Sequence, residues 1–143
     1  EVTRLGFGAM ELRDASTGRS VTEEQAELVL NAVLDAGINF IDTSIDYGGS
    51  EEFIGKYISH RRSEFYLASK CGCPVVTDST EGHVYTRENI VAGVNQSLAR
   101  MKTDHLDIVQ FHGSPSKEIL DENGAIETLL DLQSEGKIRY LGG

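Results

Sequence analysis

The chain has 143 residues, which is enough for one domain with its own hydrophobic core. Hydrophobic residues make up 39% and charged residues 25%, which excludes an intrinsically disordered chain, and no apolar run reaches the roughly 20 residues that cross a bilayer. The net charge of -10 argues against nucleic acids and anionic membranes as partners, because both are bound through lysine and arginine.

The first predicted elements are a strand and a helix. Residues 4–10 read as a short strand that runs into a glycine-containing turn. Ser20 and Thr22 offer N-caps for the helix, and Glu23 lies three residues after Ser20, as in a capping box. Apolar residues with helical spacing predict its buried face: Ala26, Val29, Leu30, Val33 and Leu34.

The alternation of strand and helix then repeats along the chain. Gly37 is placed to end the first helix, and residues 38–41 form the second strand. The remaining predicted elements are, in order, a helix capped by Ser50, a strand at 64–69, a helix capped by Thr86, a strand at 106–111, a helix at 125–135 ended by Gly136, and a strand at 137–142.

This alternation predicts an α/β fold with a parallel sheet and right-handed crossovers. Two architectures fit, an open doubly wound sheet and a (β/α)8 barrel. The pattern alone favours the open sheet, because a barrel usually needs roughly 250 residues.

The two cysteines, Cys71 and Cys73, do not provide a disulfide framework for a chain of this size. Neither has a histidine or a further cysteine beside it in sequence to complete a metal site. Residues 1–4 do not resemble a signal peptide. We therefore expect reduced thiols, no metal and a cytoplasmic location.

Ionisable side chains follow three successive strands. Asp42 ends the second strand, Lys70 the third and His112 the fourth, while Tyr47 comes five residues after Asp42. Gly8 follows the first strand. Because catalytic groups gather at the carboxyl ends of parallel strands in both architectures, we expect these side chains to form one site.

The chemistry of this group is specific. An ordinary tyrosine has a pKa of about 10, and a nearby ammonium such as that of Lys70 favours the phenolate form. Asp42 can supply the counter-ion of Lys70, and His112 can donate a hydrogen bond that orients a carbonyl oxygen. These groups suit the protonation of a carbonyl oxygen while a hydride reaches its carbon. The protein has no hydride of its own, so a nicotinamide must provide it.

The local sequences carry a resemblance to a known family. Asp42 and Tyr47 lie in INFIDTSIDYGGSEEFIG, Lys70 lies in LASKCG and His112 in LDIVQFHGSPS, while LGFGAM and GKIRYLGG match the runs into the first and fifth strands. The order of the four residues resembles the Asp-Tyr-Lys-His tetrad of the aldo-keto reductase superfamily. The resemblance covers nearly the whole chain and implies that family's (β/α)8 barrel. Residues 1–143 would then be the N-terminal half of a single barrel domain, with about the first four βα units plus the fifth strand.

The resemblance also implies roles and partners. Tyr47 would be the general acid in the reduction of an aldehyde or ketone to an alcohol, Lys70 and Asp42 would tune it, and His112 would orient the carbonyl. Residues expected near the cofactor are Gly8, Ala9, Met10 and Asp42. The implied cofactor is NADPH, with NADH as the alternative, and the implied partner is a small-molecule carbonyl substrate.

Two expectations concern the surroundings of the tetrad. The Tyr47 hydroxyl is expected within hydrogen-bonding reach of both Lys70 and His112, with Asp42 on the far side of Lys70. Glu51 is a candidate to brace the tetrad loop, whereas surface exposure is expected for His83. Taken singly, each tetrad residue also has an ordinary structural explanation.

The sequence departs from the family at its end. It stops at Gly142 and Gly143, before the Ser-Asn pair and the phosphate-binding loops of the family, so we expect it to be one segment of a longer protein. Two alternatives to an enzyme remain: a cofactor-binding, redox-sensing regulatory subunit, as among potassium-channel β subunits, and an inactive half-barrel fragment or one that assembles with another chain. The sequence does not indicate the substrate or the oligomeric state.

Overall fold

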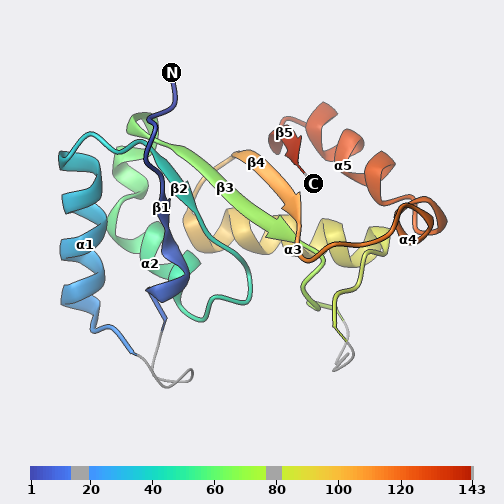
Figure 1. Cartoon of the computed structure of the whole chain (residues 1–143), viewed down its shortest axis with the longest axis horizontal. Coiled ribbons are helices and arrows are strands. Elements are labelled where there is room, and N and C mark those ends of the chain that lie inside the picture. Colours follow the sequence, from blue (N-terminus) through green and yellow to red (C-terminus); the bar gives the residue numbers. More distant parts are fainter. Residues whose placement is uncertain (14–19, 77–81, 143) are drawn as a thin grey trace.

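A five-stranded parallel sheet forms the centre of the structure, a computed structural model that describes residues 1–13, 20–76 and 82–142 (Figure 1). The strands lie side by side in chain order, which excludes the doubly wound alternative, because that fold reverses its strand order at a switch point. The strands are β1 (Phe7–Gly8), β2 (Phe40–Asp42), β3 (Tyr66–Cys71), β4 (Leu106–Phe111) and β5 (Ile138–Gly142).

The helices form a layer along one side of this sheet, as successive right-handed crossovers require (Figure 1). Within this layer α1 packs on α2, α2 on α3, and α3 on α5. The elements are η1 (Ala9–Glu11), α1 (Glu23–Asp35), α2 (Ser50–Tyr57), η3 (Ser59–Glu64), α3 (Arg87–Met101), α4 (Lys117–Glu122) and α5 (Ala125–Ser134). No helix in the described part of the chain has the length and hydrophobicity needed to cross a membrane.

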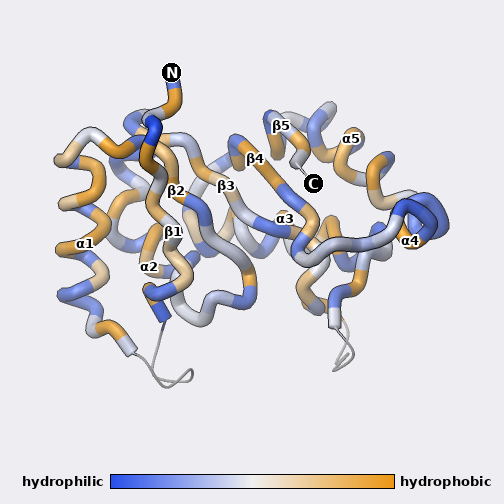
Figure 2. Tube along the Cα trace, in the orientation of Figure 1, coloured by the Kyte–Doolittle hydropathy of each residue, from blue (hydrophilic) through white to orange (hydrophobic). Residues whose placement is uncertain are grey.

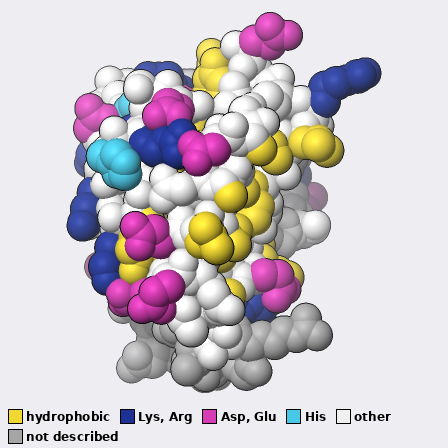
Figure 3. Space-filling view, turned by 90° about the vertical axis from the view of Figure 1, so that its left-hand side faces the viewer, with side chains coloured by type: hydrophobic (Ala, Val, Ile, Leu, Met, Phe, Trp, Pro, Cys, Tyr) yellow, Lys and Arg dark blue, Asp and Glu magenta, His cyan; other side chains and the backbone are white. Residues whose placement is uncertain are grey.

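The hydrophobic core lies between the sheet and the helices, with Ile41, Leu67 and Val109 from the strands among its members. Figure 2 shows apolar residues recurring between polar ones along α1. Only part of the predicted α1 stripe is buried, since Val29 is 37% exposed. Figure 3 looks onto the side that carries α1 and shows apolar side chains there among acidic ones.

Local signals predicted several element ends correctly. Thr86 caps α3 by accepting a hydrogen bond from the Asn89 amide, and β4 has the predicted bounds. Gly37 and Gly136 both adopt positive φ angles, of 81° and 78°, after the ends of α1 and α5.

Other element ends differ from the prediction. The capping box of α1 joins Thr22 to Gln25 instead of Ser20 to Glu23. Ser50 does not cap α2, because its buried hydroxyl bonds the Ala9 carbonyl and the Thr43 hydroxyl, at 2.9 and 2.8 Å. The first strand consists of Phe7 and Gly8 alone, so Gly8 ends the strand instead of following it, and the chain turns into η1 at Ala9.

Two further differences lie in the second half of the chain. Helix α4 was not predicted, although Ser116 caps it by accepting from the Ile119 amide. β3 continues to Cys71, so Lys70 lies within the strand one residue before its end. Parts of the predicted irregular segments 11–19 and 71–85 lie outside the described residues.

Candidate active site

The Lys70–Asp42 ion pair lies across two neighbouring strands, β3 and β2. The Lys70 ammonium donates to both Asp42 carboxylate oxygens, at 2.6 and 2.8 Å, and to the Thr43 carbonyl at 2.8 Å. These three acceptors use all three donors of the ammonium. The side chains of Lys70 and Asp42 are 14% and 28% exposed, so the pair is largely shielded from solvent.

The Tyr47 ring lies between Lys70 and His112. The Lys70 ammonium is 4.9 Å from the ring centroid, and the His112 ring is edge-on to it, with the centroids 5.9 Å apart. The four residues of the predicted tetrad therefore form one group.

The predicted hydrogen bonds of the Tyr47 hydroxyl are not present. Among the described residues, none joins this hydroxyl to Lys70 or to His112. The reason on the Lys70 side is that Asp42 and Thr43 take every donor of its ammonium. Lys70 instead contacts the aromatic ring as a cation–π pair.

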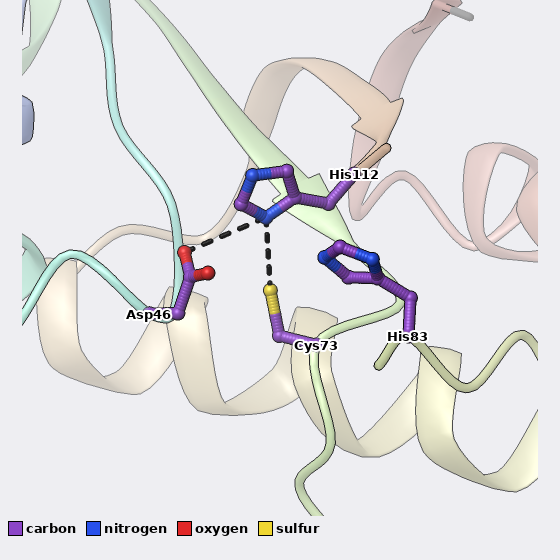
Figure 4. A group of neighbouring side chains, drawn as sticks. All are labelled: Asp46, Cys73, His83 and His112. Atoms are coloured by element: carbon purple, nitrogen blue, oxygen red, sulfur yellow. Dashed lines mark hydrogen bonds and ion pairs between the residues drawn. The ribbon is translucent and has the colours of Figure 1, made fainter. Parts of the chain in front are cut away.

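His112 directly follows β4 and is held by its backbone. Its amide donates to the Cys71 carbonyl at 2.8 Å, and its carbonyl accepts from the Tyr85 hydroxyl. Its Nδ1 lies 3.2 Å from the Ser44 hydroxyl and 3.2 Å from the Cys73 sulfur. The other ring nitrogen, Nε2, points away from Cys73 (Figure 4).

The environment of His112 favours its neutral form. Burial lowers the pKa of His112 below its ordinary value of 6.5, and the nearby His83 and Lys70 lower it further, against the opposing effect of Asp46. Burial also raises the pKa of Cys73 to about 11, which keeps this neighbour a thiol. A neutral imidazole can donate one hydrogen bond and accept another.

The buried carboxylate of Glu51 braces the strand that carries Lys70. Glu51 is fully buried and accepts from the hydroxyls of Ser69 on β3 and Ser97 on α3, at 2.9 and 2.6 Å. Arg100 pairs with it at 3.4 Å. Burial raises the pKa of Glu51, although its hydrogen bonds and the Arg100 charge oppose this.

The residues expected near a cofactor lie at the end of β1. Gly8 pairs with Asp42 in the sheet, and a β-carbon on Gly8 would meet no atom within 4 Å. Met10 is 41% exposed, whereas Ala9 is fully buried. Open space therefore lies beside Gly8, and the Ala9 side chain faces the core.

Sequence reasoning missed the groups around Nδ1 of His112, which are Ser44, Asp46 and Cys73. Ser44 and Asp46 lie between Asp42 and Tyr47, and Cys73 lies three residues after Lys70. Their closeness in sequence to the tetrad residues was the one signal that could have identified them.

His83 is exposed, as expected, but its ring centroid lies only 4.7 Å from that of His112.

A cavity of about 640 Å³ lies elsewhere in the molecule and includes no tetrad residue. Its lining includes Phe65 and His105, which directly precede β3 and β4, and Arg139, the second residue of β5. Because catalytic groups of parallel α/β folds gather at the opposite, carboxyl ends of the strands, we do not assign the reaction to this cavity.

Comparison with known proteins identifies the family. The model of the Aldo/keto reductase family matches residues 4–142. The chain belongs to the aldo/keto reductase family. The family's solved structures are (β/α)8 barrels, and the five parallel strands of this chain match about the first half of such a barrel.

Three similar proteins illustrate the extent of the match. The uncharacterized oxidoreductase YqkF of Bacillus subtilis is 34% identical over 99% of this chain and 44% of its own length. The L-galactose dehydrogenase of Arabidopsis thaliana is 33% identical over 99% of this chain and 44% of its own length. The holo form of aldo-keto reductase AKR11C1 from Bacillus halodurans is 36% identical, with a TM-score of 0.82 over 99% of this chain and 45% of that one. The chain thus spans about half the length of the relatives it matches.

Proposed function

We propose that this aldo/keto reductase reduces a small aldehyde or ketone to the alcohol, with NADPH as its cofactor and NADH as the second candidate. The observation that supports this most strongly is the arrangement of Tyr47 between the paired ammonium of Lys70 and the imidazole of His112. A bound nicotinamide would supply the hydride. We also propose a cytoplasmic location, for which the reduced thiols of Cys71 and Cys73 are the support.

In this proposal Tyr47 donates the proton to the carbonyl oxygen. The phenolate that it leaves behind is stabilised by the positive charge of Lys70, which lies over the same ring. Asp42 holds that ammonium in place and offsets the cost of its burial. In the reverse direction the phenolate acts as the base.

His112 would orient the carbonyl through Nε2. Its Nδ1 is 3.2 Å from the Cys73 thiol, which can donate its hydrogen to that nitrogen. The imidazole proton then resides on Nε2, the nitrogen that points away from Cys73 (Figure 4). A hydrogen bond from Nε2 polarises the carbonyl and fixes its position relative to Tyr47.

The residues at the end of β1 fit a flat cofactor ring. The open space over Gly8 adjoins Asp42, and the partly exposed Met10 lies next to it in sequence. We propose that Gly8, Met10 and Asp42 border the nicotinamide, and that Ala9 contributes its backbone position alone, since its side chain is buried.

The test is the reduction of a panel of aldehydes and ketones by the purified full-length protein, followed by the loss of reduced-nicotinamide absorbance with NADPH and with NADH. We expect turnover of at least one carbonyl compound, with a higher kcat/KM for NADPH. Tight cofactor binding without turnover of any carbonyl compound would instead support the regulatory-subunit alternative.

A further inference from the structure

Four potential metal ligands meet beside the candidate active site. They are Asp46 in the loop after β2, Cys73 and His83 between β3 and α3, and His112 after β4 (Figure 4). One donor atom from each residue lies within 4.8 Å of those of the other three. The side chains converge on one point from three different connections of the sheet.

We propose that this cluster binds a divalent transition-metal ion of the zinc type. One thiolate, two imidazoles and one carboxylate form a set of four ligands that suits tetrahedral zinc. Calcium and magnesium prefer oxygen ligands, so this set disfavours both. The ion would take the place of the Cys73 hydrogen at Nδ1 of His112, so the imidazole proton would remain on Nε2, and the test below measures metal binding and not carbonyl reduction.

The distances support this assignment. The Nδ1 atom of His112 lies 3.2 Å from the Cys73 sulfur and 3.4 Å from an Asp46 carboxylate oxygen. With zinc–ligand bonds of about 2.0–2.3 Å, neighbouring ligand atoms of a tetrahedron lie about 3.3–3.8 Å apart. These two separations therefore need little change, and the exposed side chains of Asp46 and His83 can move the remaining distance.

The charge of the occupied site also balances. Binding replaces the S–H bond of Cys73 with a sulfur–metal bond and releases one proton to solvent, while both imidazoles bind as neutral ligands. The dipositive ion then faces one thiolate and one carboxylate, so the site carries no net charge. No electron is transferred, because zinc is not redox active.

The sequence expectation of plain thiols considered only neighbours in sequence. The partners of Cys73 are Asp46, 27 positions before it, and His83 and His112, 10 and 39 positions after it. Only the folded chain brings these residues together. A hydrogen-bond network alone would also bring Cys73 close to His112. The two explanations differ in whether the protein binds a metal with a cysteine ligand.

The experiment is a titration of chelator-treated full-length protein with Co²⁺, followed by competition with Zn²⁺. We expect a sulfur-to-cobalt charge-transfer band and the intense visible bands of tetrahedral Co²⁺, both abolished by one equivalent of Zn²⁺. Cys73→Ala should abolish the charge-transfer band and weaken Zn²⁺ binding by about 100-fold or more, since it removes a direct ligand.

Matched variants make the result specific. Cys71→Ala removes the other buried thiol, which is not part of the cluster, and should leave the spectrum unchanged. His83→Gln replaces an exposed ligand, so it should weaken Zn²⁺ binding by about 10-fold or more without affecting folding. His60→Gln is the corresponding control outside the cluster. An octahedral Co²⁺ spectrum without a sulfur band, or equal Zn²⁺ affinity in His83→Gln and His60→Gln, would overturn the proposal.

Discussion

Lys70 and Asp42 come from adjacent strands, and the Lys70 ammonium contacts both carboxylate oxygens of Asp42, at 2.6 and 2.8 Å. The same ammonium lies 4.9 Å from the centroid of the Tyr47 ring. The ion pair therefore sets the position of the positive charge beside the proposed proton donor.

Asp42→Asn should lower kcat by about 10²-fold or more, because Lys70 loses its counter-ion and its fixed position beside Tyr47. It should also lower the free energy of unfolding by about 1–3 kcal/mol, since a mostly buried ammonium loses its charged partner. Steady-state kinetics and urea unfolding measure the two effects. The control is Asp121→Asn, which removes an exposed pair with Lys117 and should change neither quantity measurably.

Tyr47→Phe should lower kcat by about 10²–10⁴-fold, because it removes the proton donor and keeps the ring that Lys70 contacts. The dissociation constant of NADPH, measured by fluorescence, should stay within about twofold, since the hydroxyl is assigned to proton transfer and not to binding. Tyr140→Phe, on the exposed face of β5, is the matched control. A parallel loss of NADPH affinity in Tyr47→Phe would contradict the role assigned to this hydroxyl.

Gly8→Ala tests the proposed cofactor position. The added β-carbon meets no protein atom within 4 Å, so the variant should fold with nearly unchanged stability. In the proposed complex the same β-carbon enters the space for the nicotinamide and should weaken NADPH binding by about 5–30-fold, the equivalent of about 1–2 kcal/mol of steric cost. Fluorescence titration and thermal unfolding separate these effects. Unchanged NADPH affinity would place the ring elsewhere.

Glu51→Gln should change how stability depends on pH. Burial raises the pKa of Glu51 above its ordinary value of 4.5, so the folded state binds this proton more tightly than the unfolded state. The stabilising effect of the protonated form is therefore complete below about pH 4.5 and is lost as the pH rises through the higher, folded-state pKa.

Relative to Glu51→Gln, the unmodified protein should thus lose stability as the pH rises from about 4.5 through the folded-state pKa of Glu51. The glutamine carbonyl can still accept the hydrogen bonds of Ser69 and Ser97, which act on one oxygen of Glu51. Urea unfolding at a series of pH values measures the difference. Glu27→Gln, at an exposed position of α1, should follow the pH dependence of the unmodified protein.

Local sequence signals determined the elements with clear periodicity and caps. Thr86 and the apolar spacing after it define α3, and the mainly apolar segment 106–111 defines β4, because caps and side-chain periodicity act within a few residues. Placing Asp42, Lys70 and His112 together required only that parallel strands end at the same edge of a sheet. The alternation of elements fitted two architectures, however, and the length of the chain favoured the open sheet, so the resemblance to a family was needed to arrive at the barrel.

Only the tertiary structure decided the features that depend on distant contacts. The hydroxyl of Ser50 bonds Ala9 and Thr43 instead of capping its own helix, and the donors of Lys70 are used by Asp42 and Thr43 instead of by the Tyr47 hydroxyl. The side chains of Asp46, Cys73 and His83 meet at His112 although up to 66 residues separate them in sequence. The sequence by itself determined which groups reach the carboxyl edge of the sheet. Which of them touch depended on strand register and loop packing, because hydrogen bonds are formed between atoms a few ångströms apart wherever those atoms lie in the chain.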